Sequence, residues 1–335
     1  MKRALRILLL ILGIVALCAM ALVLFLFGKT TAIPPLPNPN GYDEYIKAGN
    51  LLDLATGDAY EMEYAALRDY IATNAEPVRL MRLGLSQTCS VPTMEVLTNL
   101  SGRWTDLSAT KRLAQFWTAT GRLAELDGRT NDAAGIYVQG IHFGTAINHG
   151  GFLIHALVSY ACEAIPSASL LRLVPTLDCE NARKLIAELE HIDRNAATWN
   201  DIWTSEKMFM RHELRKDLKP ARWIEIWKSL PSLKKARSKH DAITARRRLI
   251  LTELALRCYQ SENGQPPRQL DQLVPKYLER VPQDPFTTQP LVYRPDGAKW
   301  LLYSIGPDGV EDGGKPVKRL MQTPPNPGDV FFDSR

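Results

Sequence analysis

The pattern of apolar and polar positions divides the chain into three regions. Ile7 to Phe27 contains no charged residue, and from Tyr42 to Leu233 apolar residues recur at three- and four-residue spacing. After Pro231 a helical pattern is followed by short strand-like runs. Spacing near 3.6 residues places apolar side chains on one face of a helix. The chain therefore predicts a mainly α protein: an N-terminal transmembrane helix, an all-α helical domain built as a bundle or irregular solenoid, and a small α+β module.

The first apolar run is long enough to cross a bilayer. Its 21 residues span roughly 30 Å as a helix, which is the thickness of the hydrocarbon core. Lys2, Arg3 and Arg6 precede the run, and only Lys29 follows it before Asp43. Basic residues favour the cytoplasmic side. We therefore expect a single-pass protein of the cell membrane, with its N-terminus in the cytoplasm and its bulk periplasmic or otherwise extracytoplasmic.

A cleaved signal peptide and a lipoprotein are the alternatives for this run. A signal sequence has a shorter apolar region and a small-x-small site, and Val23–Phe27 offers no such site. A lipid anchor on Cys18 would need a small residue before it, where Leu17 stands. We expect residues 1–28 to be retained as a cytoplasmic tip and transmembrane helix, and residues 29–41 to form a Pro-rich linker.

The helical domain is expected at 42–233, and its clearest element is a helical hairpin. One helix should start at the cap Leu107–Thr110 and end at Asp127-Gly128, since glycine tolerates the left-handed conformation of a helix stop. A second helix should follow from Asp132. The pair looks like a tetratricopeptide hairpin, without the period of a repeat array. Further helices are expected at 59–73, 76–87, 150–164, 178–192 and 196–217.

Four cysteines follow the predicted anchor: Cys89, Cys162, Cys179 and Cys258. No two of them have C-x-x-C spacing, so zinc-ribbon and thioredoxin-like sites are not indicated. In an oxidising compartment they allow three disulfide pairings, and the alternative is that they are buried small hydrophobes. We expect at least one disulfide, between Cys162 and Cys179.

The helical domain also contains two sets of residues with chemical potential. His142, His149 and His155 lie within one stretch together with Glu163 and could serve a hydrolase, but no H-E-x-x-H or comparable spacing exists. The alternative is that they are hydrogen-bonded core residues.

The second set is the basic segment Arg211–Arg248, which carries 13 Lys or Arg against 4 Asp or Glu in a chain of net charge +5. Two tryptophan pairs at i, i+4 spacing, Trp199/Trp203 and Trp223/Trp227, lie beside or within it. They could bind an anionic glycan or lipid, or the indoles could pack inside the bundle with the lysines solvated. The small net charge indicates no nucleic-acid partner.

The C-terminal module is expected at 234–335. Lys234–Lys239 should be a junction, followed by a helix over 242–263 that stops at Asn263-Gly264. We expect a β-hairpin formed by Leu291–Arg294 and Trp300–Ser304, because the Pro-Asp-Gly sequence between them favours a tight turn.

This order of motifs resembles the C-terminal half of the type II secretion major pseudopilins. The shared pieces are YQSENGQPP, LDQLVPKYLERVPQDPF, PLVYR, LLYSIGPDG and EDGG, over roughly 245–332. A pseudopilin carries this module directly behind a prepilin helix with a G-F-x-x-x-E start. Here that start is missing and a long helical region intervenes, so the layout looks like that of uncharacterised membrane-anchored bacterial proteins with a pseudopilin-like C-terminal module.

The resemblance implies a calcium ion in the Gly/Asp-rich loop. Asp308 and Asp312 match the loop of that family, and Asp329 matches its closing acidic residue. Carboxylate and carbonyl oxygens are the ligands that Ca²⁺ prefers. A structural Ca²⁺ held by these three residues is the only cofactor expected.

No nucleophile elbow, phosphate-binding loop or dinucleotide fingerprint occurs in the chain. The leading hypothesis is therefore a membrane-anchored extracytoplasmic scaffold or interaction protein with a protein partner in the bacterial envelope. The alternatives are a membrane-anchored hydrolase that uses His or Glu of the helical domain, and a binding module for anionic glycan or lipid.

Overall fold

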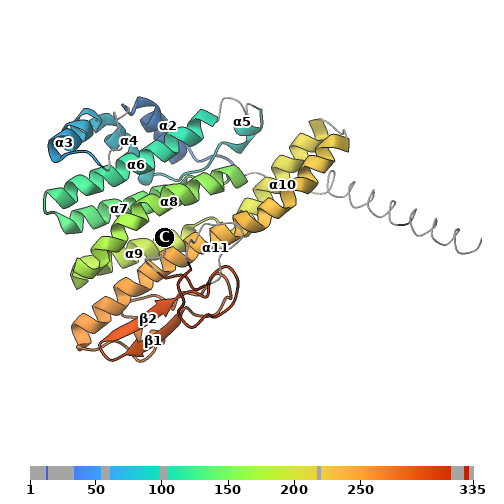
Figure 1. Ribbon diagram of the computed structural model, residues 1–335. Helices are drawn as coiled ribbons and strands as arrows, with labels where there is room; N and C mark the ends of the chain where they lie inside the picture. The colour runs from blue at the N-terminus through green and yellow to red at the C-terminus, as the bar shows by residue number, and fades with distance from the viewer. Residues whose placement is uncertain are drawn as a thin grey trace, which may run out of the picture.

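The computed structural model describes Gly13 and residues 34–53, 61–98, 104–216, 220–317 and 328–331, with side chains except at 98, 104–105 and 220–231. Over this part the protein is mainly helical, with one small two-stranded sheet near its C-terminal end (Figure 1). The predicted fold class is confirmed to that extent. Apart from Gly13, the predicted transmembrane helix Ile7–Phe27 lies outside the described residues.

The helices expected at 59–73, 76–87, 150–164, 178–192 and 196–217 have counterparts in the structure, whereas the helices at 41–51 and 93–98 were not predicted. The helices are α2 Gly41–Leu51, α3 Tyr64–Thr73, α4 Ala75–Leu85, α5 Thr93–Thr98, α6 Trp104–Leu126, α7 Thr130–Ala146, α8 Leu153–Leu173, α9 Cys179–Asn195, α10 Trp199–Lys216 and α11 Pro220–Asn263. Two short 3₁₀ turns, Val174–Thr176 and Leu270–Leu273, and the strands β1 Val292–Asp296 and β2 Lys299–Tyr303 complete the described fold.

The predicted helical hairpin is confirmed in α6 and α7. Gly128, just after the end of α6, has a φ of 75°, which is the left-handed conformation predicted for the helix stop. Gly121 lets the two helices approach, because a Cβ there would overlap the Tyr137 ring. The hairpin is therefore specified by one glycine in its turn and another between its helices.

Helices α6, α7 and α8 pack against one another, α9 packs against α7, and α11 packs against α8 and α9 before the sheet (Figure 1). Two main cores hold the stack together. One gathers α2, α4, α6 and α7 around Tyr45 and Phe143, whose rings meet edge to face at 4.8 Å. The larger core joins Leu189 of α9 and Leu254 of α11 to Leu302 of β2. This second core contains residues from both sides of the predicted boundary at 233/234.

Helix α11 begins earlier than the sequence predicted. It runs unbroken for 44 residues from Pro220, so the expected junction at Lys234–Lys239 is helix. Proline suits the first turn of a helix, and lysine and arginine are good helix formers. Together with α10, the first half of α11 forms an arm that projects from the stack (Figure 1). The region 234–335 is thus tied to the helical domain by a continuous helix.

The predicted β-hairpin is confirmed, with a shifted turn. Val292 pairs with Tyr303 and Asp296 with Lys299. Pro295 and Asp296 therefore belong to β1, and the turn lies at Gly297-Ala298, where Gly297 has a φ of 58°. The indole Nε1 of Trp300 donates to Glu253 Oε2 of α11 at 2.8 Å, which anchors the hairpin to the helix.

The expected disulfide between Cys162 and Cys179 does not form: all four described cysteines are free, and these two lie in different parts of the protein. Cys162 is fully buried in the core around Phe143. It lies 11 residues before the end of α8, which is about 16 Å along the helix axis. Cys179 begins α9 on the side that faces α11. The prediction was wrong because the length of α8 keeps these two cysteines apart.

One stretch of the described chain, Leu153–Thr176, is long and apolar enough to cross a membrane by composition alone, with a mean hydropathy of 1.3. It comprises α8 and the following 3₁₀ turn. Helix α8 packs against α6, α7 and α11, and 56% of its most apolar stretch of 18 residues is buried within the protein. Its apolar character is accounted for by its central place in the stack.

The close approach of α7 and α8 gives a test of the packing. A Cβ at Gly144 would lie 2.6 Å from the backbone N and 2.7 Å from the Cα of Glu163, and backbone cannot move aside cheaply. We expect Gly144→Ala to lower the free energy of unfolding by about 1–3 kcal/mol. Gly135 is on the same helix and would meet nothing within 4 Å, so Gly135→Ala should raise it by about 0.5–1 kcal/mol. Chemical denaturation of both variants measures the difference; equal effects would contradict the packing.

Candidate functional site

The structure brings the predicted calcium residues to one loop. Asp308 lies on one side of it, and its Oδ2 accepts a hydrogen bond from the Gly328 amide at 3.1 Å. Asp329 is fully buried at the other side. Its two oxygens face the amides of Asp312, at 3.4 Å, and of Gly314, at 2.8 Å. Asp329, which follows Asp312 by 17 residues in the chain, therefore lies against the same stretch of backbone as Asp308 and Asp312.

The electrostatics of this loop favour a positive charge. Burial raises the pKa of Asp329, and the nearby carboxylates of Asp312 and Glu311 raise it further, against the amide hydrogen bonds that lower it. Asp312 Oδ2 is buried and has no hydrogen-bond partner in the described part of the protein. A buried carboxylate oxygen without a partner is costly. A hard cation beside Asp312 would offset that cost, but among the described residues no three His, Cys, Asp or Glu side chains lie close enough together to hold a metal ion.

The histidines proposed for hydrolysis do not converge on a common site. The ring of His155 is 3% exposed, and its Nδ1 accepts the backbone N–H of Phe152 at 3.2 Å at the start of α8. His149 Nε2 lies 2.9 Å from the carbonyl of Asn195, and His142 Nδ1 lies 3.1 Å from Glu188. Each of the three interacts with a different partner, so these contacts provide no shared catalytic geometry.

Glu163 instead belongs to a buried ionic cluster with Arg247, Asp193 and Arg248. Arg247 donates to Glu163 Oε1 at 2.6 Å and to Asp193 Oδ1 at 3.1 Å, while Arg248 donates to the other Asp193 oxygen at 3.0 Å. The Arg247 side chain is 4% exposed and that of Glu163 is 2% exposed. The cluster joins α8, α9 and α11. We call these four residues the ionic cluster.

Burial governs the protonation of the ionic cluster. Burial raises the pKa of Glu163, and the charge of Arg247 only partly opposes it. Burial would also raise the pKa of Asp193, but Arg247 and Arg248 together outweigh it, so its pKa is lowered. Beside the cluster, Tyr160, His240 and Asn148 line a hollow of about 20 Å³, which is room for about one water. The site is packed rather than open, as in a structural ion-pair network.

The sequence did not reveal this cluster, because Arg247 and Arg248 were grouped with the other basic residues of the segment Arg211–Arg248. The signal was present in the pattern. Two arginines stand between apolar positions that are buried in the core, Ile243 before them and Leu249 and Ile250 after them. A charged residue within such a stripe indicates a buried partner.

The basic segment is therefore not one exposed surface. Arg246 and Arg247 are buried, and Arg237 pairs with Asp241 at 2.9 Å while its guanidinium lies 5.7 Å from the Trp199 ring. Trp199 and Trp203 are half-buried on α10. The side chains of Trp223 and Trp227 lie outside the described residues. Among its described residues, Arg237, Arg247 and Arg248 form ion pairs with Asp or Glu side chains of the same protein.

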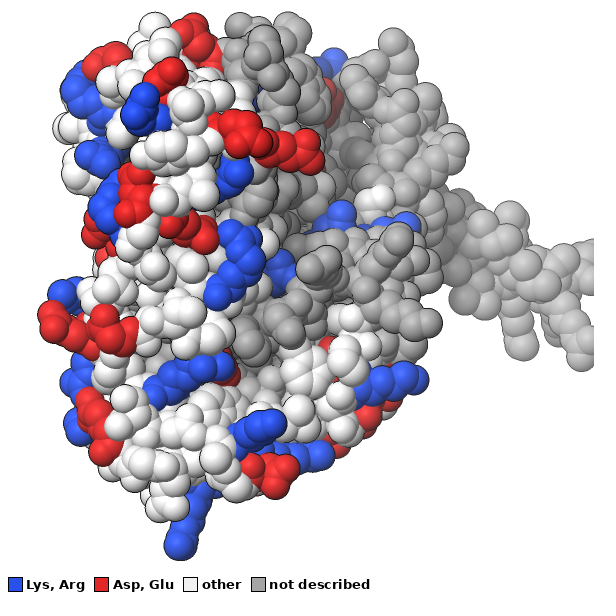
Figure 2. Space-filling model, turned by 60° about the vertical axis from the view of Figure 1, so that its left-hand side comes forward, with Lys and Arg blue, Asp and Glu red and all other residues white. Residues whose placement is uncertain are grey.

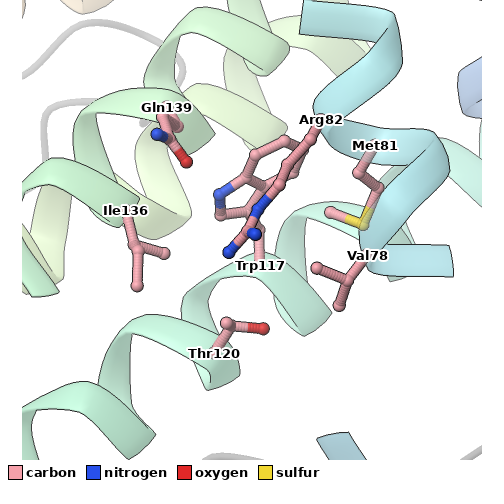
Figure 3. Close-up of a pocket in the computed structure, with 7 residues that line it drawn as sticks. All are labelled: Val78, Met81, Arg82, Trp117, Thr120, Ile136 and Gln139. Carbon is pink, nitrogen blue, oxygen red and sulfur yellow. The ribbon is translucent and has the colours of Figure 1, made fainter. Parts of the chain in front are cut away.

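The outer surface of the helix stack carries charges of both signs. Lys and Arg alternate with Asp and Glu over the described part of the face shown in Figure 2. Between α4, α6 and α7 lies a shallow apolar dimple of about 10 Å³. Figure 3 shows its lining: Val78, Met81, Arg82, Trp117, Thr120, Ile136 and Gln139. Arg82 and Gln139 are exposed at its rim, whereas Met81 and Trp117 are buried beneath.

No family model, curated protein or solved structure matches this chain. The resemblance of residues 245–332 to the pseudopilin module therefore rests on the motif order alone.

Two larger hollows flank α11. One, of about 370 Å³, lies beside β2 and is lined by Glu253, Arg257 and Trp300 among others. The other, of about 270 Å³, lies between Asp193, Arg248 and Arg280. The charged groups of both hollows have partners within the protein. Glu253 forms an ion pair with Arg257 and accepts a hydrogen bond from Trp300. Asp193 forms ion pairs with Arg247 and Arg248. The Glu253–Trp300 and Arg248–Asp193 contacts join α11 to β2 and α9, whereas the Glu253–Arg257 pair lies within α11.

Proposed function

We propose that the protein is a membrane-anchored extracytoplasmic scaffold whose helix stack binds a protein partner in the bacterial envelope. The observation that supports this is the stack of α6 to α9, with α11 tying it to the C-terminal region through a shared core. Stacked helix pairs offer extended surfaces that suit protein partners. The dimple around Trp117 is too small for a metabolite, but it suits the tip of one partner side chain.

The dimple gives this proposal a defined place on the surface. Buried Trp117 and Met81 form an apolar floor, and exposed Arg82 and Gln139 form a polar rim. An apolar centre with a polar rim is the usual organisation of a protein interface. An apolar side chain of the partner would contact the floor while polar groups meet Arg82 and Gln139.

A cross-linking experiment tests the proposal. The full chain, expressed in the membrane with a photoreactive residue in place of Gln139, is irradiated in cells and purified in detergent. We expect one specific envelope protein to be captured, and a second substitution, Arg82→Glu, to reduce its recovery at least several-fold. The control carries the photoreactive residue at exposed Lys299 on the distant hairpin. No capture at Gln139, or equal capture at both positions, would overturn the proposal.

We also propose that Asp308, Asp312 and Asp329 hold a structural Ca²⁺ in the C-terminal region. Asp312 Oδ2, without a hydrogen-bond partner among the described residues, supports this. At a free Ca²⁺ concentration 100 times the Kd, binding should stabilise the folded chain by about 2.7 kcal/mol. Thermal unfolding of the full chain with and without Ca²⁺ measures the effect.

Substitutions separate specific binding of Ca²⁺ from a general effect of charge. Asp312→Asn should abolish the stabilisation by Ca²⁺. Asp296→Asn removes one exposed carboxylate at the end of β1 and should leave the response unchanged. A response to Ca²⁺ that survives in Asp312→Asn would place the ion elsewhere, and no response in the wild-type chain would remove the calcium proposal.

A further inference from the structure

The two cysteines that lie together in the structure are Cys179 and Cys258, whereas the sequence analysis favoured Cys162 as the partner of Cys179. Cys258 Sγ lies 3.5 Å from the carbonyl oxygen of Cys179, and both thiols are free in this structure. Cys179 is the first residue of α9, and Cys258 lies near the end of α11. We propose that Cys179 and Cys258 form an intramolecular disulfide that joins α9 to α11.

The position of the two cysteines means that a bond between them would link two helices of the larger core. Helices α9 and α11 pack along their length in the larger core, and the hairpin of β1 and β2 packs on the far side of α11. The cysteines are 79 residues apart in the chain. A covalent link between them closes a long loop, and long loops lose the most conformational freedom in the unfolded chain. The disulfide therefore fastens the C-terminal region to the helical domain.

The two thiols differ in the way that oxidation requires. Cys179 is half-buried at the start of α9, so its sulfur can be reached from solvent. An accessible thiol is the one that can attack an external disulfide first. Cys258 is 1% exposed, and burial raises the pKa of its thiol. Cys179 is therefore the thiol that reacts first, and Cys258 is the resolving thiol behind it.

The oxidant is a disulfide of the compartment, such as a thiol–disulfide oxidoreductase or oxidised glutathione. The Cys179 thiolate attacks one sulfur of that disulfide, forms a mixed disulfide and releases one oxidant thiolate, which takes up a proton. Cys258 then loses its proton and attacks Cys179 Sγ, which releases the second oxidant thiolate. Two electrons pass from the cysteine pair to the oxidant, and two protons move with them.

The surroundings tolerate the loss of both thiol hydrogens. The Cys179 thiol donates to Glu262 Oε1 at 3.5 Å, a long and weak contact. Glu262 is bound more closely by Arg183 at 2.5 Å and by Lys276 at 2.6 Å. Its carboxylate keeps these charged partners when the thiol is oxidised. Cys162 is buried with Cys89 in the separate core around Phe143 and serves as a control.

The pairing is tested on the purified full chain in detergent. The protein is equilibrated with reduced and oxidised glutathione, unfolded in the presence of a maleimide and digested for mass spectrometry. We expect a cross-linked peptide containing Cys179 and Cys258 in the wild-type chain and in Cys162→Ser. We expect the cross-link to be absent from Cys179→Ser and Cys258→Ala. The Tm of the oxidised chain should exceed that of the reduced chain by roughly 5 °C.

Two results would overturn the pairing: full maleimide labelling of both cysteines after equilibration, or a cross-link dominated by another pair. The wild-type readout alone decides this, so a variant that folds poorly does not affect the test. The expectation that the bond is present in cells rests on the proposed extracytoplasmic location. Thiols trapped by acid in intact cells address that point separately. A pair that oxidises in vitro and stays reduced in cells would contradict the location and leave the pairing intact.

Discussion

Replacing Arg247 with methionine will lower the free energy of unfolding by about 3–5 kcal/mol, the usual cost of removing one partner from a buried ion pair. Arg247 contacts Glu163 at 2.6 Å and Asp193 at 3.1 Å, and its side chain is 4% exposed. Methionine preserves much of the volume but none of the charge. The fully buried carboxylate of Glu163 is then left without its cation. Denaturant unfolding of the full chain in detergent measures the loss.

A neighbouring arginine on α11 provides the matched control. Arg257 pairs with Glu253 at 2.8 Å, but its side chain is 35% exposed. Water screens such a pair, so Arg257→Met should cost less than about 1 kcal/mol. The double variant Glu163→Leu/Arg247→Met removes both charges and should recover much of the loss, because an apolar pair of similar volume replaces the ion pair. Equal costs for the two arginine variants would show that the ionic cluster does not carry the predicted energy.

The loss in Arg247→Met should also depend on pH. Burial raises the pKa of Glu163, and the charge of Arg247 opposes this rise. Without Arg247 the folded-state pKa rises further, so the folded chain binds more protons than the unfolded chain over the interval between the two pKa values. Stability then increases as the pH falls through that interval. The difference between wild type and variant should therefore be largest at neutral pH and smaller near pH 5.

The local pattern was sufficient to predict most helices and the hairpin. Gly128 is the clearest case. It follows the apolar stripe of α6 and adopts the positive φ expected where a helix ends. The strands around Gly297 were also found from turn chemistry. These features depend on residues close together in the chain, and backbone preferences act over that distance.

The features that the sequence did not yield depend on packing between distant residues. The start of α11 was placed at Ala242 because Lys234–Lys239 is polar, although polar residues form helices readily when a partner helix lies alongside. The ionic cluster joins Glu163 to Arg247 across 84 residues. Spacing along the chain cannot indicate such a contact, because it depends on which faces of α8 and α11 meet.

The candidate site shows the same division. The resemblance to pseudopilins named Asp308, Asp312 and Asp329, and the structure gathers them around one loop. The cysteines were paired from proximity in sequence, as Cys162 with Cys179. The structure instead places Cys258 beside Cys179, because α11 returns along α9. The order of motifs therefore named residues that share one loop. The neighbour of Cys179 could not be named in this way, because it depends on how α9 and α11 pack.

Acidification will destabilise the fold through His155. Burial lowers the pKa of this histidine from 6.5 to about 4. Between those values the unfolded chain binds the proton and the folded chain does not, so stability falls as the pH falls. The slope is about 1.4 kcal/mol per pH unit, which gives a total loss of about 3 kcal/mol for this group. Protonation also removes the acceptor for the Phe152 amide at the start of α8.

The substitution His155→Gln isolates this contribution, because glutamine offers an acceptor to the Phe152 amide and does not titrate. The variant should lose less stability than the wild type between pH 6.5 and 4, by about 3 kcal/mol. His240 should behave in the same way: its pKa is also lowered to about 4, by burial first and then by Arg247, Arg237 and Arg248. The two effects should add, since the rings occupy different parts of α8 and α11. Denaturant unfolding at a series of pH values gives each slope, and a wild-type slope retained in His155→Gln would show that this ring is already protonated or exposed in the folded protein.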